Sequence, residues 1–201
     1  GSQITVDDGT TITLLAQDRE GYKNLCRLIT HGRLRCEKGS SHVSWCEVAQ
    51  YAPGQIALWG GSESLLVAEP EAEGEIARTA GLLGEAFGDR WYGLVARHLA
   101  AGEKQREKRL RARAARFGLP LVAGHEVLYH SRARRPLQDV LTSIRHTIPV
   151  ADAGRLLKPN DRHGLTGAAV FDRVFADDPA AVTRSLEVAA RCNFSLDELR
   201  Y

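Results

Sequence analysis

The chain has 201 residues, enough for one domain with a buried core, and its 43% hydrophobic and 26% charged residues are typical of a globular protein. A formal net charge of +2 excludes nucleic-acid binding that depends on overall charge, so any such contact must be local. No apolar run approaches the ~20 residues of a membrane span and no secretory signal is present, which favours a cytoplasmic location without a membrane partner.

The cysteines and the first residue give further limits. Four cysteines, at positions 26, 36, 46 and 192, are scattered without a CxxC pair. This spacing argues against a zinc ribbon and suits reduced thiols in a cytosol. The chain has no methionine and begins with Gly1. We therefore expect a fragment or a processed chain, in which Gly1 and Ser2 are either native or the remnant of a tag.

The first third of the chain alternates short strands with helices. Residues 7–9, Asp-Asp-Gly, are a hairpin turn signal between two β-type segments. Ser44 is a suitable N-cap for a short helix, and Pro53-Gly54 marks the break before a buried strand. The expected strands are 3–6, 11–16 and 55–59, and the expected helices are 22–29 and 45–52.

The middle and end of the chain continue this alternation. Gly88 and Gly118 each follow a helical pattern, as C-terminal glycines do. The expected helices are 70–87, 101–117, 166–175 and 179–191, the last with an N-terminal cap signal at 177–179, and the expected strands are 91–96 and 119–123. The order β-α-β-α-β predicts an α/β fold with mostly parallel strands and outer helices, and it ends at an irregular basic loop, residues 150–164.

Titratable residues follow the strand at 119–123 directly. His125 and Glu126 come first, His130 lies behind them, and a helix begins at Pro136, where a first helical turn tolerates proline. In α/β enzymes, functional side chains collect at the carboxyl ends of strands. We therefore expect any chemistry of this chain to lie here.

Residues 120–146, PLVAGHEVLYHSRARRPLQDVLTSIRH, resemble the late strand–loop–helix of the polymerase-and-histidinol-phosphatase (PHP) domain. The resemblance is to the version at the front of bacterial DNA polymerase III alpha-type subunits, most of all their error-prone, lesion-bypass branch. Other stretches agree in the family's order: TITLLAQDREGYKNLCRLIT at 11–30, PGQIALWGG at 53–61 and AAVTRSLEVAARCNFSLDELRY at 180–201.

This resemblance implies an incomplete (β/α) barrel of the PHP type over residues 1–148, lacking its first strands. A loop and helices at 149–201 would then lead towards the polymerase palm. The parent chain would be a DNA-directed DNA polymerase, a nucleotidyltransferase for damage-tolerant replication and repair. Its partners would be DNA, its own other domains and accessory proteins of replication or lesion bypass. The fragment itself would be structural, bracing the polymerase or docking a partner.

PHP domains hold divalent metals at the carboxyl end of the barrel and hydrolyse phosphoesters. The family's first motif, His-x-His, lies outside this chain. Gln3, Thr11, Gly61 and Leu128 stand at positions that match family ligands, and Glu126 stands where the family has an aspartate. The resemblance therefore implies a degenerate site, with no phosphoesterase activity and no cofactor in this fragment. Zinc or manganese is expected only if the site is retained.

His125, Glu126 and His130 are the remaining candidates for a weak, vestigial metal site. We favour the interpretation that they are a polar strand end, either exposed to solvent or satisfied by local hydrogen bonds, because a competent site needs three or more convergent ligands. An active metal-dependent phosphoesterase or 3′-5′ proofreading nuclease remains the main alternative. Surface or capping roles are expected for the isolated histidines, which are His31, His42, His98, His146 and His163.

Two basic segments are candidates for contact with phosphate. The helix at 104–116 carries seven Lys and Arg, and could contact DNA or an acidic partner through Arg109, Arg111 and Arg113. We favour a solvated outer helix instead, since a run of charge is most often an exposed face. A second patch, Arg132, Arg134 and Arg135, lies beside the expected site. The three tryptophans, at 45, 59 and 91, are expected in the core.

Overall fold

The computed structural model describes residues 1–199 and is built on one five-stranded sheet. Strands β3, β4 and β5 are parallel to one another, whereas β2 runs antiparallel to both β1 and β3. The α/β class with mostly parallel strands is confirmed, and the open sheet is consistent with an incomplete barrel. The strands lie side by side in chain order: β1 (Ser2–Thr5), β2 (Thr11–Ala16), β3 (Gln55–Gly60), β4 (Trp91–Ala96) and β5 (Leu121–Gly124).

The helices follow the predicted order, and their ends are fixed by local signals. Ser44 and Glu47 form a capping box at the start of α2, and Asp178 caps α7. Gly118 closes α4 in the left-handed conformation, at φ +70°. The helices are α1 (Arg19–Leu34), α2 (Trp45–Gln50), α3 (Glu73–Phe87), α4 (Glu103–Phe117), α5 (Arg135–His146), α6 (Ala168–Val174) and α7 (Pro179–Arg191).

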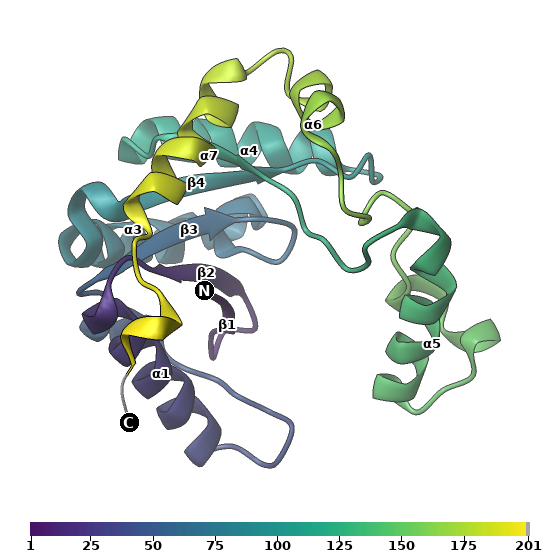
Figure 1. Ribbon diagram of the computed structural model, residues 1–201, viewed down its shortest axis with the longest axis horizontal. Coiled ribbons are helices and arrows are strands. Elements are labelled where there is room, and N and C mark those ends of the chain that lie inside the picture. Colours follow the sequence, from purple (N-terminus) through teal and green to yellow (C-terminus); the bar gives the residue numbers. More distant parts are fainter. Residues whose placement is uncertain (200–201) are drawn as a thin grey trace.

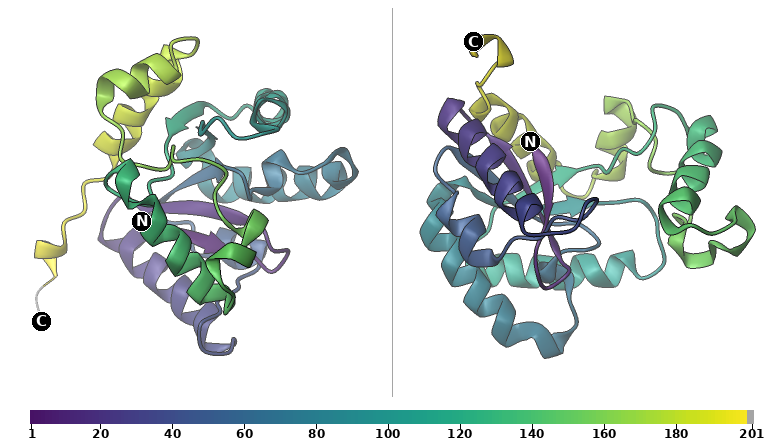
Figure 2. Two further views of the ribbon diagram at one scale, coloured as in Figure 1. Left: turned by 90° about the vertical axis from the view of Figure 1, so that its right-hand side faces the viewer. Right: turned by 90° about the horizontal axis from the view of Figure 1, so that it is seen from below.

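The two faces of the sheet are covered by different helices. Helices α1 to α4 bury the main core, in which Trp59 stacks on Trp91 at 5.8 Å and meets Trp45 edge-on at 6.0 Å. All three tryptophans are buried, as the sequence predicts. Figures 1 and 2 show α7 on the side of the sheet opposite α4, where Val188 packs against Tyr92 and its neighbours on the strands.

Helix α5 stands apart from the rest of the fold. It lies beyond the carboxyl ends of β3 and β4, with the short turns that follow it (Figure 1). The chain then returns to the sheet and continues into α6 and α7. Arg200 and Tyr201, the end of the segment predicted to lead towards a palm, lie outside the described residues. Within residues 1–199, no helix combines the length and the apolar character needed to cross a membrane.

Candidate functional site

A cluster of histidines and one carboxylate lies at the carboxyl ends of β4 and β5. His98 follows the end of β4 by two residues, and Glu126 follows the end of β5 by two residues. The segment between α5 and α6, residues 147–167, adds His163, and we call this segment the returning chain. Each of the three offers one ligand atom, and these atoms all lie within 4.8 Å of one another. We call these residues, with the adjacent His125 and Lys158, the strand-end cluster.

The returning chain is held in place by backbone hydrogen bonds beyond the end of β5. The Leu128 amide donates to the His163 carbonyl at 2.9 Å, and the Leu165 amide donates to the Tyr129 carbonyl at 3.0 Å. Tyr129 and Gly164 form an isolated parallel bridge between the two segments. These contacts lie outside the five strands of the sheet, and they position His163 beside the segment that follows β5.

The three imidazoles of the cluster form a stack. The His98 ring lies 4.1 Å from His163 with an interplanar angle of 7°, and 4.7 Å from His125 with an angle of 24°. His98 and His163 are only 7% and 4% exposed. The Nε2 of His125 lies 2.9 Å from the Gly164 carbonyl oxygen, so this nitrogen donates. Burial, with the neighbouring imidazoles, lowers the pKa of His98 to about 4, and the ring is therefore neutral at pH 7.

Glu126 is the anion of the cluster, and two groups hold it. One carboxylate oxygen lies 2.9 Å from the Nζ of Lys158 and 3.0 Å from the Nδ1 of His163. The contact with His163, followed by that with Lys158, lowers the pKa of Glu126 to about 2 in spite of burial. The Glu126 side chain is 39% exposed, so water screens part of this attraction. The carboxylate stays ionised at neutral pH with an ammonium as its counter-ion.

The backbone after β4 is held by Glu103, the first residue of α4. Its carboxylate accepts hydrogen bonds from the amides of His98 at 2.7 Å and Leu99 at 2.8 Å. Leu99 has φ +56°, a conformation that residues with a Cβ rarely adopt. On the other side, the Asn160 side-chain amide donates to the His98 carbonyl at 2.7 Å. The position of His98 is therefore set by α4 and by the returning chain together.

Two imidazoles and one carboxylate are a known zinc ligand set, but this arrangement does not fit one ion. The lone pair of an imidazole nitrogen lies in the ring plane, and a zinc–nitrogen bond is about 2.0–2.1 Å. Because the His98 and His163 rings are nearly parallel with centroids 4.1 Å apart, an ion in the plane of one ring lies outside the plane of the other. Lys158 already supplies positive charge to Glu126. In this arrangement the positive charge beside Glu126 is the Lys158 ammonium.

The structure places the three predicted site residues differently. His125 and Glu126 lie in the cluster, whereas His130 is exposed and lies outside it. The expectation that His98 and His163 have surface or capping roles is wrong, since both are buried in the stack. His98 had a usable signal, because it follows the predicted strand 91–96 at the same distance as His125 follows the predicted strand 119–123. His163 lies in the irregular loop and had none.

Four of the positions that the resemblance assigns to family metal ligands, Gln3, Thr11, Gly61 and Leu128, have non-ionisable side chains, and Glu126 is the exception. Gln3 and Thr11 contact each other, with the Gln3 Nε2 donating to the Thr11 hydroxyl at 3.2 Å. The Thr11 amide donates to the Glu63 carbonyl at 3.0 Å, just past Gly61 at the end of β3. These positions therefore gather at the carboxyl end of β3. Leu128 lies on the segment paired with the returning chain.

The three α4 arginines that were predicted to contact DNA or an acidic partner are engaged within the fold. Arg113 is 5% exposed and donates to two backbone carbonyls as well as to a carboxylate. Contact with DNA through these arginines would require their ion pairs to break, and it stays a prediction. Each arginine donates to a carboxylate of another element: Arg109 to Glu69, Arg111 to Asp178 and Arg113 to Glu73.

The second basic patch is only partly engaged. Arg135 donates to the Lys158 carbonyl at 3.0 Å and lies 3.7 Å from Asp139. Arg132 and Arg134 are exposed, and neither has an ion-pair partner among residues 1–199. A phosphate-binding role for this patch stays a prediction, with Arg132 and Arg134 as its free cations.

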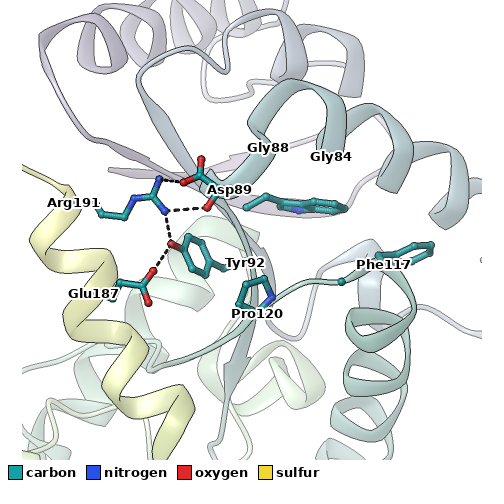
Figure 3. Close-up of a pocket in the computed structure, with 10 residues that line it drawn as sticks. Gly84, Gly88, Asp89, Tyr92, Phe117, Pro120, Glu187 and Arg191 are labelled. Atoms are coloured by element: carbon teal, nitrogen blue, oxygen red, sulfur yellow. Dashed lines mark hydrogen bonds and ion pairs between the residues drawn. The ribbon is translucent and has the colours of Figure 1, made fainter.

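A pocket of about 490 Å³ lies at the opposite, amino ends of β4 and β5 (Figure 3). The Tyr92 hydroxyl donates to Glu187 at 3.0 Å, and Arg191 donates to that hydroxyl at 2.6 Å and to the Asp89 carboxylate at 3.0 Å. Burial, followed by the hydrogen bond to Glu187, raises the pKa of Tyr92. These polar groups form hydrogen bonds with one another. They connect α7 to the sheet at this pocket, which we call the joint between α7 and the sheet.

The chain is similar along its whole length to curated proteins named error-prone DNA polymerase. It is 38% identical to the one from Pseudomonas paraeruginosa and 37% identical to the one from Pseudomonas aeruginosa, in each case over 100% of this chain. It is 39% identical to the one from Anaeromyxobacter dehalogenans over 94% of this chain. The chain spans 18%, 18% and 16% of the length of these three relatives. No family model matches the sequence. The relatives support the resemblance to the error-prone branch.

Proposed function

We propose that this chain is part of an error-prone DNA polymerase and forms an incomplete barrel of the PHP type. Residues 1–148 would be the barrel, and residues 149–201 would lead towards the palm. Similarity to polymerases over the whole chain supports this proposal, as does the open sheet with functional groups at its strand ends. DNA synthesis on damaged templates would belong to the longer chain and would take place in the bacterial cytoplasm. DNA, the other domains and lesion-bypass proteins would be its partners.

The role we assign to residues 1–201 is that of a scaffold with a degenerate metal site. The observation that carries this role is the contact between the Lys158 ammonium and the Glu126 carboxylate, at 2.9 Å. A divalent ion at Glu126 would lie beside a fixed positive charge, and like charges at short range repel strongly in a partly buried site. The parallel rings of His98 and His163 point to the same conclusion, because they cannot share an ion without rotating.

Metal content and hydrolysis test this proposal. The chain is dialysed against zinc or manganese, freed of excess ion and analysed for metal, and it is then assayed on a chromogenic phosphoester. We expect far less than one ion per chain and hydrolysis no faster than in buffer. Lys158→Met should raise metal retention, and Lys104→Met, at an exposed position on α4, should not. One tightly held ion per unmodified chain, together with turnover, would overturn the proposal.

An active metal-dependent phosphoesterase or proofreading nuclease is the second candidate. It is favoured by the closeness of the His98, Glu126 and His163 ligand atoms, all within 4.8 Å. It would require Lys158 to leave Glu126 and one ring to turn. His98→Ala and His163→Ala would then abolish both metal retention and hydrolysis, whereas His130→Ala, outside the cluster, would leave both unchanged.

A further inference from the structure

Helix α5 has few packing partners within residues 1–199. Its main contacts are with the short turns on either side of it in the sequence, Arg132–Arg134 and Val150–Asp152. Figure 1 and the right-hand view of Figure 2 show it separated from the sheet. A helix of 12 residues with little tertiary packing is marginally stable in water. Within residues 1–199, α5 therefore receives little stabilisation from tertiary packing.

One face of α5 is a continuous apolar stripe. Leu137, Val140, Leu141 and Ile144 follow the spacing of one helical face and are 52%, 42%, 52% and 68% exposed. Six of the thirteen exposed large apolar side chains of residues 1–199 lie between positions 137 and 156. Single exposed apolar residues are ordinary, but a contiguous stripe of this kind marks an interaction surface.

The surroundings of the stripe are cationic. Seven Lys and Arg but only three Asp lie between positions 132 and 162. Arg132, Arg134, Arg145 and Arg155 are exposed, and none of them has an ion-pair partner in the part of the chain that the structure describes. An interface with an apolar centre and a charged rim requires a partner with the opposite charge at its rim. The matching surface would be apolar with carboxylates around it.

We infer that the α5 stripe docks onto an acidic-rimmed apolar surface elsewhere in the same, longer polymerase chain. This inference rests on the proposed function, in which residues 1–201 are one part of such a chain. The relatives are much longer, since this chain spans only 18% of their length. A surface linked covalently to α5 has a high effective concentration, so even a modest patch binds it.

Two other occupants fit the observations less well. A second copy of this chain, docked stripe to stripe, would bring the unpaired arginines of both copies together, and that arrangement is repulsive. Duplex DNA would satisfy the arginines but offers no apolar face for Leu137, Val140, Leu141 and Ile144, because its backbone contacts are polar and charged. A protein surface with an apolar centre and carboxylates at its rim can contact both the apolar stripe and the arginines around it.

Cysteine accessibility tests this docking. Leu141→Cys and Ile144→Cys are introduced into residues 1–201 alone and into the longer polymerase chain, and maleimide labelling of each position is followed by peptide mass spectrometry. Leu34→Cys, at an exposed leucine on α1, is the matched control. Labelling of both α5 positions should be about tenfold slower or more in the longer chain, as for a site that reacts only when a contact opens. Labelling of the control should change much less.

Charge reversal tests the rim. Arg134→Glu combined with Arg145→Glu should restore fast labelling of α5 in the longer chain, whereas Arg27→Glu, an exposed cation on α1, should not. Equal labelling rates in residues 1–201 alone and in the longer chain overturn the inference. Slower labelling of residues 1–201 that appears when this chain self-associates, or when duplex DNA is added, also overturns it. If the longer chain also fails to synthesise DNA, the proposed function fails; if it synthesises DNA with α5 fully accessible, only the docking fails.

Discussion

Replacing Arg113 by leucine tests how the basic helix is used. Arg113 lies on α4 and is 5% exposed; its guanidinium donates to the carbonyls of Leu66 at 2.9 Å and Ala68 at 2.8 Å and to the Glu73 carboxylate at 2.7 Å. Arg113→Leu leaves two carbonyls without donors, at about 1–3 kcal/mol each. Relief from burying a cation offsets part of this cost. We expect a loss of about 3 kcal/mol in the free energy of unfolding, a decrease of roughly 6–12 °C in Tm for a chain of this size.

Arg116→Leu is the matched control for this variant. Arg116 lies three positions further along α4, contacts the same Glu73 at 3.1 Å and is 57% exposed, so its replacement should cost less than about 0.5 kcal/mol. Urea denaturation, monitored by circular dichroism, gives the unfolding free energy of each variant. The two values are comparable when the variants have equal m-values. If Arg113→Leu is as stable as Arg116→Leu and instead weakens DNA binding, then Arg113 faces the solvent and the reasoning is refuted.

Three further predictions concern a tight backbone contact, an ion pair and the joint between α7 and the sheet. Gly21→Ala should lower the unfolding free energy by at least about 2 kcal/mol in urea denaturation, because its Cβ would lie 1.8 Å from a carbonyl oxygen of the loop before β3. Hydrogen bonds from Arg97 lower the pKa of Asp177 to about 2, so the stability from this pair is present above the usual pKa and is lost as the pH falls towards 2. Carbon-detected NMR titration should show that low midpoint, and Arg97→Met should return it towards the usual value. Arg191→Met should cost about 1–3 kcal/mol in thermal unfolding, because the buried Tyr92 hydroxyl loses a charged donor.

Controls separate these effects from general damage. Gly74→Ala, on α3, places its Cβ where no atom lies within 4 Å and should leave stability unchanged or slightly higher. Arg173→Met, at an exposed position on α6, should cost less than about 0.5 kcal/mol. An equal loss of stability in either control would contradict the stated cause, as would a midpoint for Asp177 that does not move when Arg97 is replaced.

The strands and helices could be predicted because their signals are local. The capping residue Ser44 and the left-handed Gly118 fix helix ends within a few residues of sequence. The β-branched and apolar runs fix the strands in the same way, and β4 has the predicted bounds. Residues 70–72, predicted as the first turn of α3, form a separate 3-10 turn instead, with Pro70 as its first residue.

The strand-end cluster could be predicted only in part because it depends on tertiary structure. His125 and Glu126 follow a strand that the sequence predicts, so their position at a sheet edge could be inferred. His163 and Lys158 reach the same place through pairing between Leu128 and the returning chain, which involves no periodic pattern. The contact of Lys158 with Glu126 joins residues 32 positions apart, so no local pattern in the sequence indicates it.

The arginines of the chain divide into two groups with different consequences. On α4, Arg109 and Arg111 are paired with Glu69 and Asp178. The cations without an ion pair in the described part of this helix, Lys104, Arg106 and Lys108, lie near its start, and no exposed large apolar side chain lies on the helix. The exposed arginines around α5 have no such partners, and they border the apolar stripe. A net charge of +2 therefore conceals a localised excess of positive charge. Because apolar exposure and unpaired charge coincide at α5 and not at α4, contact with the remainder of a longer polymerase should occur through α5.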